Sequence, residues 1–168
     1  MTLDPRKPLV VHVGELRRRT GTRADLRREA VLEDLALSTS GVVPGGVVVV
    51  EGALESMADG VVVTGTVSAP WEAACRRCLG PATDRLTVAV REVFVTNPIE
   101  GETWPLARDQ LDLEPMVREA VLLALPLAPL CRPDCPGVGP EAGAPGGDEA
   151  QTEGGDPRWA ALDQLRFD

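Results

Sequence analysis

The spacing of the four cysteines constrains the fold of this sequence more than any other feature. They form two short hooks, CRRC and CRPDC, separated by 52 residues and made of Cys75, Cys78, Cys131 and Cys135. Paired hooks of this kind commonly give four thiolates to one tetrahedral zinc ion, because each turn points two sulfurs at the same place. Four protein ligands leave no open position on the metal, so the pattern favours a structural zinc that clamps two parts of the fold.

Two other uses of the cysteines stay open, namely a redox pair at Cys75 and Cys78 or four unligated thiols. A thioredoxin-type C-x-x-C opens a helix, whose N-terminus lowers the thiol pKa. Here the first hook runs into Gly80-Pro81, which is a poor helix start. Arg76, Arg77 and Arg132 stand beside the cysteines and would offset the charge of a zinc–tetrathiolate centre.

Valine-rich stretches predict most of the core. The first two are separated by MADG, whose Asp59-Gly60 favours a turn, and we expect them to form an antiparallel hairpin. In the third, apolar and polar residues alternate until the pattern slips at Glu92, which suggests a bulge. The three predicted strands cover residues 45–56, 60–69 and 84–95.

A strongly apolar segment predicts one packed helix over 112–125. Asp112 is the expected N-cap, Glu114 and Pro115 suit the first turn, and Pro126 ends the helix. A helix this apolar packs against something, most simply one face of the sheet. Residues 97–111 are predicted to be loop. Residues 23–37 fit neither a helix nor a strand clearly, so their secondary structure stays open.

The expected fold is therefore α+β: a mainly antiparallel, valine-rich sheet packed by one apolar helix, with its loops clamped by zinc. We expect a single core domain over 1–135. Residues 136–155 are rich in Gly, Pro and acidic side chains and predict a flexible linker. Residues 156–168 predict a short amphipathic helix, with Trp159 on its apolar face.

Charge is distributed unevenly along the chain. The formal net charge is −9, which argues against nucleic-acid binding over the whole surface. Residues 1–29 nevertheless carry eight basic and four acidic side chains. This basic head is a candidate contact for RNA or for an acidic partner, although it could equally be a solvated face. Its candidate contact residues are Arg17, Arg18, Arg19, Arg23 and Arg27, and Trp159 is a further candidate for binding a partner.

No constellation of catalytic residues is recognisable. His12 is the only histidine, which makes a serine or cysteine triad unlikely, and the glycine-rich stretches match no phosphate-binding loop. The longest strongly apolar run, 120–130, is too short to cross a membrane and holds two prolines. We expect a cytoplasmic protein without a membrane partner or a signal segment.

The ordered motifs of the chain are similar to those of the YceD family, the large ribosomal RNA subunit accumulation proteins. The resemblance rests on CRRCLGPATDRLTVAVREVFV, on LDLEPMVREAVLLALPLAPLCRPDC, on the terminal DPRWAALDQL and on the opening HVGELRRRTG. It spans nearly the whole chain. Many members continue the second hook into a further C-x-x-C-G, where this sequence has Gly139 and Ala142.

The resemblance implies a non-enzymatic ribosome-biogenesis factor needed for the accumulation of large-subunit (23S) ribosomal RNA. Its partners would be that RNA or early assembly complexes of the large subunit. The family's cysteine hooks fall on the two hooks of this sequence. Two alternatives remain beside this reading: a thiol/disulfide redox protein that uses Cys75 and Cys78, and an acidic interaction module for a basic ribosomal protein.

Overall fold

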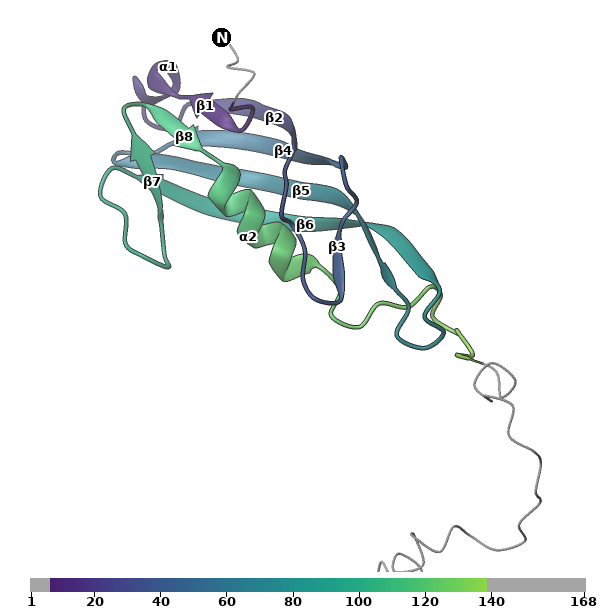
Figure 1. Ribbon diagram of the computed structural model, residues 1–168. Coiled ribbons are helices and arrows are strands. Elements are labelled where there is room, and N and C mark those ends of the chain that lie inside the picture. The colour runs from purple at the N-terminus through teal and green to yellow at the C-terminus, as the bar shows by residue number, and fades with distance from the viewer. Residues whose placement is uncertain (1–6, 139–168) are drawn as a thin grey trace, which may run out of the picture. The chain divides into compact units, whose positions relative to one another are not determined.

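The computed structural model describes residues 7–138, which hold eight strands and two helices (Figure 1). The expected linker from residue 139 onward and the terminal segment 156–168, with Trp159, lie outside the described residues. In chain order the elements are β1 Val10–His12, α1 Gly14–Arg17, β2 Arg23–Val31, β3 Ser40–Val42, β4 Val47–Ser56, β5 Gly60–Ala74, β6 Pro81–Val95, β7 Trp104–Ala107, β8 Gln110–Asp112 and α2 Glu114–Ala124.

Three long strands, β4, β5 and β6, form the centre of the sheet. Their valines suit a pleated, half-buried surface, where branched side chains pack well. The expected hairpin is present: β4 and β5 pair antiparallel, and the amide of Met57 donates to the carbonyl of Gly60 across the turn at 2.9 Å. β5 and β6 then pair antiparallel without interruption, from Gly60 opposite Val95 to Ala74 opposite Pro81. The end of this long ladder is where the first cysteine hook lies.

The sheet curls, so that its two ends face each other. The strand order is β1-β8-β7-β6-β5-β4-β2, with β3 paired to β5; the pair β6/β7 is parallel and the other pairs are antiparallel. Val11 of β1 and Leu26 of β2 line one cavity, although they belong to opposite ends of this order. The chain is therefore a sheet-dominated α+β protein with few helices, in agreement with the expected fold class.

α2 packs on the inner face of the sheet, over β5 and β6 (Figure 1). Met116, Val117 and Val121 of this helix are buried, and Phe94 of β6 lies in the same core cluster. The helix expected over 112–125 is present as α2, but its predicted N-cap, Asp112, is wrong. Leu113 is the N-cap residue, while the carboxylate of Asp112, at the end of β8, accepts a hydrogen bond from the amide of Glu114 at 3.0 Å.

The bulge expected at Glu92 is absent, because the pairing of β5 with β6 keeps one register throughout. Glu92 continues the inner face of β6, between Val90 and Phe94, and its carboxylate accepts a hydrogen bond from Nε1 of Trp104 at 2.9 Å. The alternation of apolar and polar residues breaks at Glu92 because this charged residue occupies an inward position, where Trp104 is its hydrogen-bond partner.

Two other segments also differ from expectation. Residues 97–111, expected to be loop, contain the short strands β7 and β8, and Pro105 lies within β7. The parallel contact places Pro105 opposite Val95 at the end of the sheet pairing, where proline is tolerated. The ambiguous segment 23–37 contains β2, whose buried positions include Leu26 and Ala30.

Candidate metal centre

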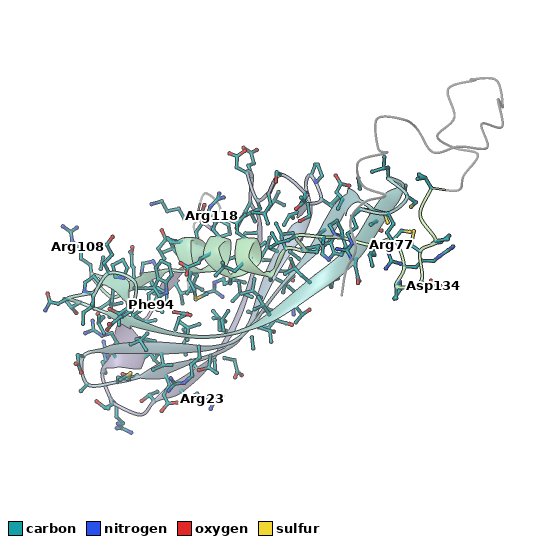
Figure 2. The ribbon with its side chains drawn as sticks, turned by 90° about the horizontal axis from the view of Figure 1, so that it is seen from below. Arg23, Arg77, Phe94, Arg108, Arg118 and Asp134 are labelled. Atoms are coloured by element: carbon teal, nitrogen blue, oxygen red, sulfur yellow. The ribbon has the colours of Figure 1, made fainter. Side chains whose placement is uncertain are left out.

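The two cysteine hooks lie side by side, although 52 residues separate them in the sequence. The first hook is the turn between β5 and β6, and the second follows α2. Figure 2 shows Arg77 from the first hook and Asp134 from the second beside the clustered sulfur atoms. The fold thus joins the loop after the hairpin to the loop after the helix, as the spacing predicts.

Backbone hydrogen bonds shape the first hook. The amide of Cys75 donates to the carbonyl of Gly80 at 2.8 Å, and the amide of Leu79 donates to the carbonyl of Cys75 at 2.9 Å. The second bond closes a tight turn, and Leu79 adopts a left-handed φ of 60° at its end. This turn brings the thiols of Cys75 and Cys78 to the same side.

Direct contacts tie the second hook to the first. The amide of Arg76 donates to the carbonyl of Pro129 at 2.9 Å, and the guanidinium of Arg77 donates to the carbonyl of Cys135 at the same distance. Nη1 of Arg77 also lies 3.4 Å from the carbonyl of Pro133. Arg77 is therefore more than a nearby positive charge, because its side chain holds the backbone of the opposite hook.

The four sulfurs have the separations that a tetrahedral centre requires. All four lie within 4.8 Å of one another, with Cys75 and Cys135 at 3.8 Å and Cys78 and Cys131 at 3.7 Å. A tetrahedral site with metal–sulfur distances of about 2.3 Å places its sulfurs about 3.8 Å apart. A disulfide would need about 2.05 Å, so the cysteines are free thiols. The cluster could hold one metal ion.

The hooks differ in how far their thiols are buried. Cys75 and Cys135 are buried in a small apolar cluster with Ala82, whereas Cys78 is half-buried and Cys131 is exposed. Trp71 of β5 packs against this cluster and also against the main core. Sequence reasoning missed Trp71, because nothing in a lone tryptophan four residues before a cysteine indicates that it joins two clusters.

The thiols perturb one another strongly. Hydrogen bonds from the backbone of Cys78 and then of Cys131 lower the pKa of the Cys75 thiol to about 6. A hydrogen bond with the side chain of Cys135, followed by desolvation and the other two thiols, raises the pKa of Cys131 to about 12. The surroundings of Cys75 thus favour its thiolate and those of Cys131 favour its protonated thiol, and a bound divalent cation would favour the thiolate of both.

Arg132, in the second hook, lies beside an acidic residue of the same hook. Nε of Arg132 lies 3.4 Å from the carboxylate of Asp134, so part of its charge is offset within the second hook. Gly137, just after that hook, has a left-handed φ of 88°.

The arginines of the basic head lie on α1, on the turn after it and on β2, away from the cysteines in the fold (Figure 2 labels Arg23). Three of them form ion pairs: Arg17 with Asp109, Arg18 with Glu15, and Arg27 with both Glu29 and Glu51. Arg19 and Arg23 are exposed and pair with no other described residue. Among the described residues, Arg19 and Arg23 are therefore the two predicted contact residues without an ion pair.

The family model described as "Large ribosomal RNA subunit accumulation protein YceD" matches residues 63–166, more than half of the chain. The chain belongs to the YceD family. The match begins within β5 and includes both cysteine hooks and α2. The family's name indicates a role in the accumulation of large-subunit ribosomal RNA.

Relatives of the chain occur in mycobacteria. Uncharacterized protein Rv2926c of Mycobacterium tuberculosis is 35% identical over 168 residues, which cover 94% of this chain and 81% of the relative. Uncharacterized protein ML1660 of Mycobacterium leprae is 29% identical over 171 residues, covering 94% of this chain and 77% of the relative. No solved structure matches the chain significantly. Neither helix within residues 7–138 has the length and apolar character needed to span a membrane.

Proposed function

We propose that this YceD family member is a non-enzymatic factor that supports the accumulation of large-subunit (23S) ribosomal RNA in the cytoplasm. Its partners would be that RNA or early assembly complexes of the large subunit. Membership in the family is the observation that carries the proposal. The cysteine cluster adds a structural role to it: we infer that Cys75, Cys78, Cys131 and Cys135 bind one zinc ion that rigidifies the surface used for assembly.

The chemistry of the ligands supports a structural zinc. Four thiolates at these separations suit a soft, tetrahedral metal, and zinc is the common occupant of such closed sites. A fully liganded zinc has no position for water or substrate, so its contribution would be to stability alone. The clamp would hold the tip of the β5/β6 ladder against the segment that follows α2.

The redox alternative fits the cluster less well. A thiol–disulfide exchange protein needs an accessible nucleophilic sulfur, whereas Cys75, the thiol with the lowered pKa, is fully buried. Sulfur contacts also run between the hooks, from Cys75 to Cys135 at 3.8 Å and from Cys78 to Cys131 at 3.7 Å, so the thiols of the first hook do not form an isolated pair. Turnover of a dithiol substrate by the zinc-loaded protein would favour the redox reading over the clamp.

A genetic experiment tests the proposed function. In a strain that lacks the gene, we expect the ratio of 23S to 16S ribosomal RNA to fall, and the intact gene to restore it. Complementation by Cys75→Ser with Cys135→Ser should fail, because the clamp would be lost. An unchanged RNA ratio in the deletion strain would contradict the proposed function.

Direct RNA contact through the basic head is a separate proposal. Arg19 and Arg23 are the strongest candidates, and replacing both with glutamine should weaken binding to 23S RNA and reduce its dependence on salt. The matched control is Arg17→Gln with Arg27→Gln, since both of these arginines are already ion-paired. If neutralising all five head arginines left binding and its salt dependence unchanged, the acidic surface would instead be the one that meets a basic ribosomal protein.

A further inference from the structure

The long strand β6 has an open edge. It pairs with β5 along its whole length, but on its other side β7 pairs only with Phe94 and Val95. Within residues 7–138, positions 82–93 therefore have no strand partner on that side. An open edge presents backbone donors and acceptors that can pair with another chain.

A groove runs along this edge, between β6 and α2, with a volume of about 250 Å³. Val88, Ala89 and Val90 of β6 line the groove. All three belong to the stretch of β6 that pairs with β5 on one side and has no strand partner among the described residues on the other. Leu123 of α2 lines the same groove and is 80% exposed, which leaves part of the apolar helix uncovered.

One end of the groove is acidic. Glu92 and Glu119 line it, and a second hollow of about 210 Å³ shares both carboxylates and Trp104 and adds Glu102. The lining of the two hollows contains no Lys, Arg or His. None of the three carboxylates forms an ion pair with another residue in the described part of the chain.

We propose that the groove between β6 and α2 binds an extended, basic segment of another protein, which adds to the open edge as a further strand. Apolar side chains on one face of the segment would lie against Val90 and Leu123. Further along the same face, arginine or lysine side chains would reach Glu92 and Glu119, and main-chain hydrogen bonds would supply the rest of the affinity. The carboxylates repel phosphate, so the groove fits a protein segment and not RNA. This inference does not rest on the zinc clamp or on the RNA contact.

The test uses the full-length protein and labelled probes of about ten residues or nucleotides, the length of a strand of ordinary size. The probes are a peptide that carries valines and then arginines on one face, with threonine at the alternate positions, the same peptide with glutamate in place of arginine, and single-stranded oligouridylate. Fluorescence anisotropy should show binding of the basic peptide with a dissociation constant below about 1 mM, and no binding of the other two. Failure of the basic peptide to bind, or equal binding of the acidic peptide or the RNA, would overturn the proposal.

Matched variants locate the binding. Leu123→Ser and Glu119→Lys should each weaken binding of the basic peptide by about tenfold or more, because each removes a contact made in the groove. Leu127→Ser and Glu55→Lys are the controls, since Leu127 is 75% exposed and Glu55 lies on β4, and neither lines the groove. Equal effects of the test and control variants would contradict the site.

Hydrogen exchange tests the mode of binding. Bound peptide should slow amide exchange at residues 87–91, because the open edge gains main-chain partners. Slower exchange confined to α2 would mean that the segment is not added as a strand, and would overturn that part of the inference.

Discussion

Arg77 illustrates how much a single side chain contributes to the cysteine cluster. Its guanidinium reaches from the first hook to backbone carbonyls of the second, at 2.9 Å from that of Cys135 and 3.4 Å from that of Pro133. Arg76, its neighbour, donates a hydrogen bond from its backbone amide to the carbonyl of Pro129, just before the second hook. Arg76 and Arg77 carry the same charge but have different structural roles, and substituting each in turn can distinguish the two roles.

We predict that Arg77→Ala lowers the free energy of unfolding of the zinc-loaded protein by about 1–2 kcal/mol, because charged donors to backbone carbonyls are lost. Urea unfolding measures this change, and transfer of zinc to a chromogenic chelator should also be faster. Arg76→Ala is the control and should change stability by less than about 0.5 kcal/mol. Equal effects of the two substitutions would mean that only charge matters at this position.

Cys131 offers a second test, because it is exposed and contributes little to packing. We predict that Cys131→Ser abolishes tight zinc binding, since a fourth thiolate is removed. Thermal unfolding should then be insensitive to chelator in the variant, while the wild-type protein loses stability when chelator is added. A variant that still responds to chelator like the wild type would show that Cys131 is not a ligand.

Among the elements, the ladder of β4, β5 and β6 positions the first hook. Gly52 and Gly65 face each other across β4 and β5, and a Cβ atom added to Gly65 would lie 2.0 Å from the carbonyl oxygen of Glu51. The strands approach closely here, so the backbone would have to shift to accept a side chain. The effect would spread along β5 toward the hook at its end.

We predict that Gly65→Ala lowers the free energy of unfolding by about 1–3 kcal/mol, the range typical of overpacking. Chemical denaturation of the zinc-loaded protein measures it. Thr66→Ala, at the next and exposed position of β5, should change stability by less than about 0.5 kcal/mol. A neutral Gly65→Ala would show that β4 and β5 can separate at this point without cost.

The elements also show what can be predicted from sequence. The hairpin, the third strand and the helix were predictable because their valine runs and Pro115 act locally. β7 and β8 were missed, since strands of four and three residues hold too few positions to show a period. Glu92 misled the pattern because its partner, Trp104, is twelve residues away.

In the candidate site, too, the local signal was predictable from sequence and the long-range contacts were not. The cysteine spacing predicted which four residues meet, because few arrangements use two hooks of this kind. It could not predict that Arg77 holds the opposite backbone or that Trp71 packs between two clusters, since both depend on contacts across the fold. The ion pairs of the head arginines could not be predicted either, because their acidic partners include Glu51 and Asp109, which are distant in sequence.

In the whole molecule, the proposed zinc is a local clamp on a sheet that has its own core. Phe94, Val61 and Val63 lie far along the β5/β6 ladder from the hook and are almost fully buried. Removal of the metal should therefore loosen one end of the molecule first.

We predict that chelation accelerates amide hydrogen exchange at residues 71–83 and 126–137, while the amides of Val61, Val63 and Phe94 stay protected. Mass spectrometry of peptic fragments measures both regions in one experiment. Uniform acceleration along the whole chain would mean that the sheet cannot fold without metal, and no change anywhere would mean that the cysteines do not hold a metal that matters for stability.

Native mass spectrometry of the purified protein, with a count of free thiols before and after chelation, shows whether the four cysteines hold a structural zinc. We predict one zinc per chain, no disulfide, and four reactive thiols once the metal is removed. A folded, metal-free protein with a disulfide between Cys75 and Cys78 would contradict it, and would make redox chemistry the function to explain.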